Sequence, residues 1–558
     1  MLNFKGFDKL IEYYEFSKKV LSNNNIFFVG WVVRDILLNI RTNNFEDIDI
    51  TLAWKPEVIY NTLDKSSWSI FKTDKFWTIT IVDKEKNCQF EITPFREEGT
   101  YSDNRHPDEL KWTNNLLLDS IRRDFTINCL YYAFVNAWFT FSLEFDFDEI
   151  DIDYEKALKI LKNKGYLIIK TDTIPIVIVQ NQELISKIVN NWKIDIDFLK
   201  NYIGWFDKIH LILDPQKWLN DLINQKLRAV WNPDNRIQED ALRIIRGIRF
   251  VSILNKYDWI NLDFEWKTWL AMKKFYFLLR NIAKERVIQE MKKVFKKWNA
   301  FWFIGLMDEL NILKFYFPAL YRCKHNDQPT RYHPFDTYSH SLLTLYHLQN
   351  ISSDYLVRFW MLYHDVWKPD QYYWASIKKD EESSQQLYKL PIVHPQIWSE
   401  YAKEDFSKLW FSKKEVEEIS FYVLYHMFPW ELINMGKNKR KNEIKKFISQ
   451  YWVDKLLNLC DITIWDRLWQ YNPLQHSNIE WVYKLKEEIL EIYNEFGRIT
   501  LKDLAVNWND IVKLLWWAWP MVGKILNYLL EIVLENPDLN KKDILLEKAE
   551  EYLKSLNS

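Results

Sequence analysis

The sequence predicts an α+β protein in which a small sheet-containing domain precedes a long helical body. Over residues 1–142, short runs of β-branched and aromatic residues alternate with helical patterns, as expected of a domain that mixes helices and strands. From about residue 207 onward, the apolar residues recur almost entirely with helical spacing. Hydrophobic residues make up 48% of the 558 residues and charged residues 27%, so packed cores are expected and global disorder is excluded.

Five regions are expected along the chain. The first contains four β-like runs, at 26–30, 45–51, 77–83 and 88–95. The regions are a head at 1–142, an insertion of unknown role at 143–206, a helical neck and body at 207–318, a histidine-containing domain at 319–480 and a helical tail at 481–558.

Composition limits the class of protein. The four cysteines are scattered and form neither a disulfide framework nor a CxxC metal site. No apolar run reaches the roughly 18 residues of a membrane span, and the N-terminus has the pattern of an amphipathic helix rather than a secretory signal. We therefore expect a cytoplasmic protein without membrane contact. Because the net charge is only -2, any contact with nucleic acid must come from local basic patches.

Two aspartates indicate a metal site in the head. Asp47 and Asp49 lie in the β-like run FEDIDIT, where the period of two places both carboxylates on one face. Such a pair repels unless a cation lies between its members, and Mg²⁺ is the usual cation. A solvated acidic strand edge is the alternative for this pair alone. Upstream, VGWVVRDILLN at 29–39 predicts a strand, a glycine turn and a helix start, whose backbone N–H groups suit a triphosphate.

Three motifs follow one another in the head. The first, Gly30-Trp31-Val32-Val33-Arg34-Asp35, matches G-G-x-V-R-D except at Trp31, the second is the D-x-D pair, and the third is R-R-D-F-T-I-N at 122–128. In this order they resemble the class II tRNA nucleotidyltransferases (CCA-adding enzymes) and their close relatives, the bacterial poly(A) polymerases. The resemblance covers most of the chain.

The resemblance implies a polymerase-β-like nucleotidyltransferase head, followed by an all-helical neck and body, an HD domain and a tail. It implies that Asp47 and Asp49 are catalytic and hold two Mg²⁺ ions, and Glu91 is a weaker candidate for a third acid. Arg123 and Asp124 would contact the ribose and phosphates of the nucleotide. The full set of implied nucleotide-binding residues is Gly30, Trp31, Arg34, Arg123, Asp124, Asn128, Asp240 and Arg243.

Asp240 and Arg243 lie in EDALRIIRGIRF, where a spacing of three makes them neighbours on a helix. In isolation they would be a surface salt bridge, but in the resembled family such a pair reads the incoming base. Aspartate only accepts and arginine only donates hydrogen bonds, which matches the amino group and ring nitrogen of cytosine and adenine. Uracil and guanine would leave buried groups unpaired. The pair therefore predicts selection of CTP and ATP.

Histidines and aspartates in the second half follow the order H…HD…H…H…D of HD-domain phosphohydrolases. Imidazole and carboxylate ligands suit a divalent transition metal such as Mn²⁺, Fe, Ni²⁺ or Zn²⁺, although a lone histidine on a helix is usually structural. Asp461 competes with the last aspartate as a ligand, and turnover at this site is left open. The implied ligands are His340, His364, Asp365, His394, His426 and Asp466.

The implied reaction is stepwise transfer of CMP, CMP and AMP from CTP and ATP to the acceptor end of tRNA. GTYSDNRHPDELKW at 99–112 is similar to the flexible loop of full CCA-adding enzymes. Lysines and arginines between 272 and 298 suit tRNA phosphates, with a solvated helix face as the equal alternative. Two other functions remain: a poly(A) polymerase acting on RNA 3′ ends, and an HD phosphohydrolase whose head only binds.

Tryptophan stands where the resembled family has glycine. The chain has only 10 glycines and 29 tryptophans, whereas glycine is usually about 7% of a soluble protein. Indole is the worst replacement where φ is positive or where the backbone approaches a ligand. We therefore hypothesise that the gene reads UGA as glycine and that the printed sequence reads it as tryptophan. The positions concerned are Trp31, Trp77, Trp218, Trp231, Trp367, Trp398, Trp508, Trp516 and Trp519.

Overall fold

A computed structural model shows two compact units, Met1–Val287 and Ile288–Ser558, which we describe separately. The predicted α+β fold class is confirmed: strands lie in the first unit and helices make up the second. In the described part of the chain, no helix is both long enough and apolar enough to cross a membrane. The structure describes residues 5–21, 25–40, 45, 47–63, 69–73, 78–83, 88–99, 109–136, 154–169, 174–190, 193–196, 198–199, 208–297, 299–324, 335–349, 354–366, 394–468, 476–514 and 519–557.

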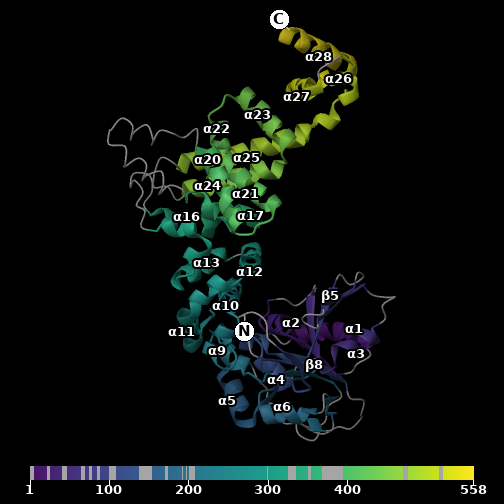
Figure 1. Ribbon diagram of the computed structural model, residues 1–558, viewed down its shortest axis with the longest axis vertical. Helices are drawn as coiled ribbons and strands as arrows, with labels where there is room; N and C mark the ends of the chain where they lie inside the picture. Colours follow the sequence, from purple (N-terminus) through teal and green to yellow (C-terminus); the bar gives the residue numbers. More distant parts are fainter. Residues whose placement is uncertain are drawn as a thin grey trace. The chain divides into compact units, whose positions relative to one another are not determined.

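Among these residues the first unit is built on a nine-stranded sheet with the order β3-β4-β5-β2-β1-β8-β13-β10-β9 (Figure 1). The central strands β1, β2 and β5 correspond to three of the runs that the sequence predicted, and β4 to the fourth. The strands are β1 (Ile26–Val29), β2 (Asp47–Leu52), β3 (Ser69–Thr73), β4 (Thr78–Asp83), β5 (Cys88–Pro94), β8 (Tyr131–Asn136), β9 (Tyr166–Ile169), β10 (Ile176–Val179) and β13 (Lys208–Leu213).

One face of this sheet is covered by α1 (Leu10–Leu21). The buried residues of α1 are Leu10, Tyr14, Ser17 and Leu21, which form one helical stripe. The Tyr14 hydroxyl donates to the carbonyl of Ile26 over 2.8 Å, and its ring packs edge-on against Phe28 of β1. Because Phe28 pairs with Ile50, α1 covers the Ile50 side of β2 and leaves the aspartates on the opposite side.

The sheet does not end near residue 142, where the sequence pattern predicted the boundary. The described part of the segment at 143–206 contributes β9 and β10, and β13 joins them to β8. β10 runs parallel to β13, and β9 pairs with β10 antiparallel. The runs YLII and IVIV are only four residues long, and such short apolar runs do not distinguish a strand from a buried helix segment. The expectation of an almost entirely helical chain from about residue 207 does not hold at β13, which pairs with β8 and β10.

The rest of the first unit consists of short strand pairs and helices. The pairs are β6 (Arg96–Glu98) with β7 (Leu110–Trp112), β11 (Val189–Asn190) with β12 (Lys193–Ile194), and β14 (Lys226–Leu227) with β15 (Asp263–Phe264). The helices are η1 (Lys5–Lys9), α2 (Trp31–Leu37), α3 (Pro56–Thr62), α4 (Leu116–Ile121), η3 (Thr126–Asn128), α5 (Tyr154–Lys164), α6 (Gln182–Ile188), α8 (Trp218–Ile223), α9 (Pro233–Glu239), α10 (Leu242–Leu254), α11 (Trp266–Phe275) and η4 (Tyr276–Asn281). The helix α12 (Lys284–Lys297) extends across the boundary of the units.

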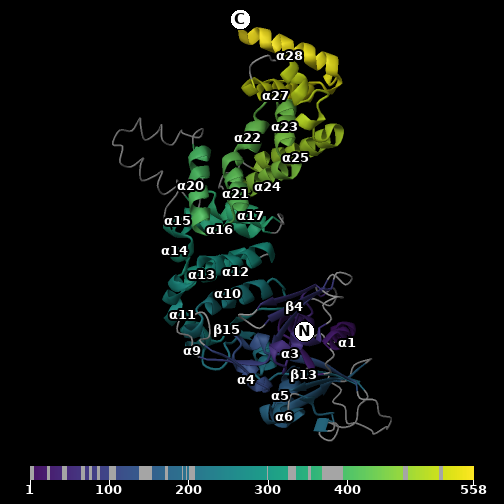
Figure 2. The same cartoon turned by 45° about the vertical axis from the view of Figure 1, so that its right-hand side comes forward.

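The second unit is helical throughout its described part, and α16, α17, α21 and α24 pack on one another at its centre (Figure 2). The tail has a separate apolar core, formed by residues between Leu504 and Ala549. The helices are α13 (Ala300–Glu309), α14 (Leu313–Tyr316), α15 (Pro318–Arg322), α16 (Thr337–Leu348), α17 (Tyr355–Tyr363), α20 (His394–Lys408), α21 (Lys413–Tyr425), α22 (Phe428–Ile433), α23 (Lys437–Gln450), α24 (Val453–Leu468), α25 (His476–Phe496), η6 (Leu501–Asp503), α26 (Trp508–Leu514), α27 (Trp519–Glu535), η7 (Pro537–Leu539) and α28 (Lys542–Asn557).

Candidate active site

Three carboxylates meet on the face of the sheet opposite α1. Asp47 and Asp49 lie on β2, and Glu91 lies on the parallel strand β5 directly beside Asp49. One oxygen of each carboxylate lies within 4.8 Å of the others. Among the described residues, the buried Oδ1 of Asp47 has no hydrogen-bond donor. Glu91 accepts a hydrogen bond from the side-chain amide of Gln89 over 3.1 Å. Carboxylate oxygens that converge in this way fit a divalent cation.

The electrostatics of this cluster also favour a cation. Burial, followed by the charge of Glu91, raises the pKa of Asp47 to about 6. Burial raises the pKa of Asp49 to about 7, and the charges of Asp47 and Glu91 act in the same direction. Like charges that raise one another's pKa are relieved when a metal ion binds between them. The three carboxylates can therefore hold a divalent metal.

The turn before α2 brings backbone close to the carboxylates. Gly30 has φ 78° and ψ -131°, a conformation that is essentially reserved for glycine. A Cβ atom at Gly30 would also lie 3.3 Å from Oδ2 of Asp49. Trp31 is the first residue of α2. Arg34 lies on the same helix but is buried, and its guanidinium donates to Asp35 over 2.6 to 2.7 Å.

Arg123 and Asp124 are held from different sides. Arg123 donates to Asp119 over 3.0 Å and to the hydroxyl of Tyr131 over 3.1 Å. Asp124 accepts from Arg246 over 2.6 to 2.8 Å and from the amide of Asn128 over 3.0 Å. Burial acts to raise the pKa of Asp124, but Arg246, Asn128 and the N–H of Phe125 hold it well below its usual range. Both side chains are thus charged and fixed before any ligand binds.

Asp240 and Arg243 are close in the chain but are not on one helix. The prediction of a continuous helix is wrong here, because α9 ends at Glu239 and Asp240 has an extended backbone. The side chain of Asp240 accepts from the N–H of Leu242 over 3.0 Å, which satisfies a donor at the start of α10, and pairs with Arg286 at 3.1 Å. Arg243 donates to Glu239 over 2.9 Å.

The second unit contains another candidate metal centre. His340 of α16, His364 and Asp365 after α17, and Asp466 of α24 each offer a ligand atom within 4.8 Å of the others. Nε2 of His340 lies 3.2 Å from Nε2 of His364 and 3.1 Å from Oδ1 of Asp466. Two imidazoles and two carboxylates around one point are a donor set that suits a divalent transition metal.

The charges at this centre are strongly coupled. Burial acts to lower the pKa of His364, but Asp365 and Asp466 raise it to about 10. Burial lowers the pKa of His340. Two carboxylates beside His364 favour its charged form, and they would also favour a bound cation.

His426, which was also predicted for this centre, is placed differently. Nδ1 of His426 lies 2.7 Å from the carbonyl oxygen of Val423, and its ring stacks on Trp398, so it is not one of the four converging ligands. Asp461, the rival aspartate, pairs with Lys486 at 2.5 Å. The side chain of His394 lies outside the described residues.

Known protein families match two parts of this chain. The poly A polymerase head domain family matches residues 26–144, and the probable RNA and SrmB-binding site of polymerase A matches residues 261–323. The CCA-adding enzyme of Staphylococcus saprophyticus is 28% identical over 301 residues, which cover 52% of this chain and 53% of that one. The CCA-adding enzyme of Enterococcus faecalis is 30% identical over 270 residues, which cover 48% of this chain and 44% of that one.

The chain is thus similar to poly A polymerase head domains over residues 26–144 and to CCA-adding enzymes over about half of its length. It spans about half the length of the curated relatives that it matches. In fold it is similar to the Bacillus stearothermophilus CCA-adding enzyme in complex with CTP, with a TM-score of 0.55, 16% identity and coverage of 99% of this chain and 98% of that one. The match to the head family ends at residue 144, whereas the sheet of this chain continues into β13, β10 and β9.

Sequence reasoning missed several charged residues around the site. Arg246 pairs with Asp124, and Arg286 pairs with Asp240. Asp119 pairs with Arg123. The signal for Arg246 was available, because it follows Arg243 by three residues and shares a face of α10 with it. The partners of Arg286 and Asp119 could be identified only from the folded chain.

Several expectations fall outside the described residues. They concern most of the loop at 99–112 and the tryptophans at 77, 367 and 516, and the structure says nothing of their surroundings.

Two tryptophans adopt the backbone conformation of glycine. Trp231, one of the positions expected to be glycine, has φ 60°. Trp410 also has φ 60°, and it follows α20 where the N–H of Phe411 donates to the carbonyl of Phe406 and its own N–H to that of Ser407. This pattern is a Schellman motif, whose left-handed residue is usually glycine. By contrast, Trp218 is fully buried with an ordinary backbone.

Proposed function

We propose that this protein adds CMP, CMP and AMP stepwise to the 3′ end of tRNA, with CTP and ATP as donors. The carboxylates of Asp47, Asp49 and Glu91 beside the Gly30 turn carry the proposal. It is supported by the names of the curated relatives, which are CCA-adding enzymes. The substrates of this reaction agree with the cytoplasmic location expected from the sequence.

In this proposal Asp47 and Asp49 hold two Mg²⁺ ions. Bound there, such ions supply a more acidic 3′-hydroxyl and neutralise charge on the triphosphate. The backbone after Gly30 and the start of α2 orient the triphosphate, since N–H groups at a helix start favour an anion. Arg123 neutralises phosphate charge, and Asp124 accepts from the ribose hydroxyl.

Asp240 and Arg243 select the base in this proposal. Without a nucleotide, Asp240 pairs with Arg286 and Arg243 with Glu239. A cytosine or adenine edge offers Asp240 a donor and Arg243 an acceptor. A uracil or guanine edge offers neither in the required place and leaves both charges unpaired.

The proposed function is tested with tRNA that lacks CCA, incubated with Mg²⁺ and each nucleotide singly and together. Ordered addition of C, C and A that stops after three nucleotides supports the proposal. An A-only tail on unrelated RNA identifies a poly(A) polymerase instead. Absence of incorporation by the folded protein contradicts both polymerase functions and favours the HD centre.

Substitution Arg243→Ala is expected to lower the preference for CTP over UTP by about tenfold or more, because unpaired polar groups contribute strongly to rejection. The preference is measured as a ratio of kcat/KM values. Arg249→Ala is a matched control on the same helix, since the guanidinium of Arg249 packs on the ring of Phe250. An unchanged ratio in Arg243→Ala would show that this residue does not read the base.

A second activity is proposed for the centre at His340, His364, Asp365 and Asp466, namely hydrolysis of a phosphodiester or phosphomonoester with a bound transition metal. The support is the convergence of four ligand atoms in a buried place. His364→Ala is expected to abolish stoichiometric metal in the purified protein, measured by elemental analysis, and to leave nucleotide incorporation unchanged. His347→Ala is the control, because the ring of His347 stacks on Trp465 outside the ligand set. Equal metal content in both variants would contradict the site.

A further inference from the structure

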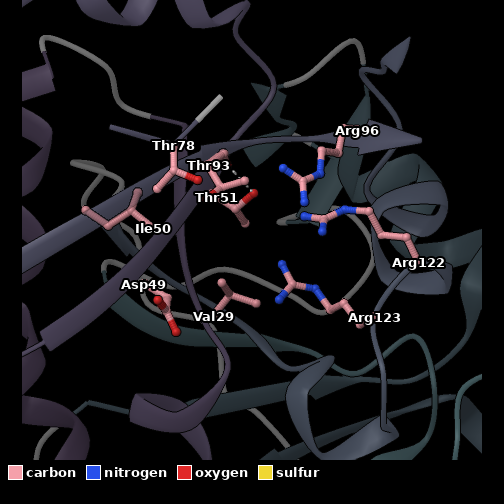
Figure 3. A pocket seen from close by; sticks show the side chains of 9 residues that line it. All are labelled: Val29, Asp49, Ile50, Thr51, Thr78, Thr93, Arg96, Arg122 and Arg123. Carbon is pink, nitrogen blue, oxygen red and sulfur yellow. Dashed lines mark hydrogen bonds between the residues drawn. The ribbon is translucent and has the colours of Figure 1, made fainter. Parts of the chain in front are cut away.

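A polar cavity of about 180 Å³ lies on the carboxylate face of the sheet. Arg96, Arg122 and Arg123 line one wall, and Asp49 and Thr93 lie on the opposite wall (Figure 3). Figure 3 shows the three guanidinium groups pointing toward the strand residues. The base-selecting residues Asp240 and Arg243 do not line it, so the cavity is separate from the place of the base.

The three arginines are fixed by two carboxylates. Asp119 accepts from Arg122 over 2.7 Å and from Arg123 over 3.0 Å, and Glu98 accepts from Arg96 over 3.0 Å. Three guanidinium groups and two carboxylates leave an excess of one positive charge on this wall. Burial, followed by the charge of Arg122, lowers the pKa of Arg96. An anion in the cavity would relieve this repulsion, and it would meet donors that are already oriented.

The strand register places this cavity on one side of Asp49 and the Gly30 turn on the other. In the antiparallel pair of β1 and β2, Phe27 lies opposite Thr51 and Phe28 opposite Ile50. If this register continues along both strands, Gly30 lies opposite Ile48, which is next to Asp47. Thr51 and Thr93, which line the cavity, pair with each other two residues beyond Asp49.

Nucleotidyl transfer requires the attacking and leaving oxygens to lie roughly in line on opposite sides of the reacting phosphorus. With the triphosphate at the Gly30 turn, the strand that carries the attacking hydroxyl approaches from the far side of Asp49. The arginine-lined cavity is on that side. Its guanidinium donors match phosphate oxygens and carry no information on base sequence.

We propose that Arg96 and Arg122 bind the terminal phosphodiester of the RNA strand that is to be extended. This inference rests on the proposed polymerase function. The cavity thereby holds the strand end beside Asp49, while Arg123 stays with the incoming nucleotide. Arg96 and Arg122 are positioning residues for the attacking strand.

The test is a thermodynamic cycle that combines the substitution Arg96→Ala with a change in the RNA, in which the last linkage is a neutral methylphosphonate. Affinities for RNA with an ordinary and with a neutral last linkage are measured at several salt concentrations, without turnover. Arg96→Ala is expected to lower the affinity for RNA with an ordinary last linkage about tenfold, as for loss of a charged hydrogen bond. It should also reduce the slope of log affinity against log salt by about 0.7. In this variant, the neutral linkage should cause no further loss of RNA affinity.

A phosphate of the nucleotide could in principle occupy the same donors, and the kinetics distinguish the two sources. Arg96→Ala should raise KM for RNA and leave KM for CTP and inhibition by pyrophosphate unchanged. The reverse result, or an equal cost of the neutral linkage in both proteins, overturns the proposal. Arg228→Ala is a matched control, since Arg228 pairs with Asp221 away from the cavity.

Two further measurements keep the outcome clear. Arg96→Lys keeps a charge but loses the fork, so it should show an intermediate loss of RNA affinity even if Arg96→Ala fails to fold. Incorporation by the unsubstituted protein is scored separately. Incorporation without coupling between Arg96 and the linkage contradicts only the cavity, whereas coupling without incorporation supports the cavity and contradicts the proposed function.

Discussion

Replacing Asp49 with asparagine is expected to reduce nucleotide incorporation by more than about 100-fold, because even outer-shell partners of metal ligands commonly cost 10- to 100-fold. Asparagine has the same shape but lacks the negative charge that holds a divalent ion. Incorporation is measured with saturating Mg²⁺, CTP and tRNA lacking CCA. Activity within a few fold of the unsubstituted protein would contradict the role of Asp49.

The same substitution is expected to stabilise the metal-free protein. The pKa of Asp49 rises from an unfolded value near 3.8 to about 7, so the folded state binds the proton more tightly. The free energy of unfolding of the unsubstituted protein therefore falls as pH rises from about 4 to about 7. Asp49→Asn removes this loss of stability. At pH 8 with a chelator present, the free energy of unfolding of the variant should exceed that of the unsubstituted protein by about 1–2 kcal/mol. Thermal unfolding across this pH range, with the exposed Asp258→Asn as control, measures the difference.

Replacing Trp410 or Trp231 with glycine is expected to increase the free energy of unfolding by about 1 kcal/mol each. Both residues have φ 60°, and the left-handed conformation costs a residue with a Cβ atom about 1–2 kcal/mol. Both indoles are largely exposed, at 60% and 65%, so little apolar burial is lost. The stability is measured by denaturant unfolding of each variant.

Trp266→Gly is the matched control for this prediction. Trp266 is 64% exposed but begins α11 and does not have positive φ, so glycine there should lower stability by about 0.5–1 kcal/mol. Equal effects at all three positions would contradict the conformational explanation. A peptide spanning residue 410 from the source organism, identified by mass, would show directly whether the native residue is glycine.

The sequence predicted those parts of the site that lie within one strand or one short motif. Asp47 and Asp49 share a face because strand alternation is a local property, and the glycine turn precedes α2 because only that residue tolerates the required φ. The α+β class was predicted from the spacing of apolar residues in strands and in helices, which is also a local property. These features need no knowledge of distant residues.

The predictions that were wrong concern segments with weak local signals. The strands β9 and β10 have four residues each, and their apolar runs became interpretable as strands only through pairing with β13. The break between α9 and α10 at Asp240 has no glycine or proline to mark it. The hydrogen bond that Asp240 accepts from the N–H of Leu242, together with its ion pair with Arg286, accompanies this break instead.

What the sequence by itself determined is therefore the local chemistry: carboxylates on one strand face, a glycine turn, and charged motifs that resemble those of nucleotidyltransferases. Only the tertiary structure decided which of these charges meet. Glu91 joins the aspartates because β5 pairs in parallel with β2, and Arg96 faces Asp49 across a cavity because β6 directly follows β5. Such meetings depend on strand pairing between distant segments, which burial of the whole core selects and no local pattern specifies.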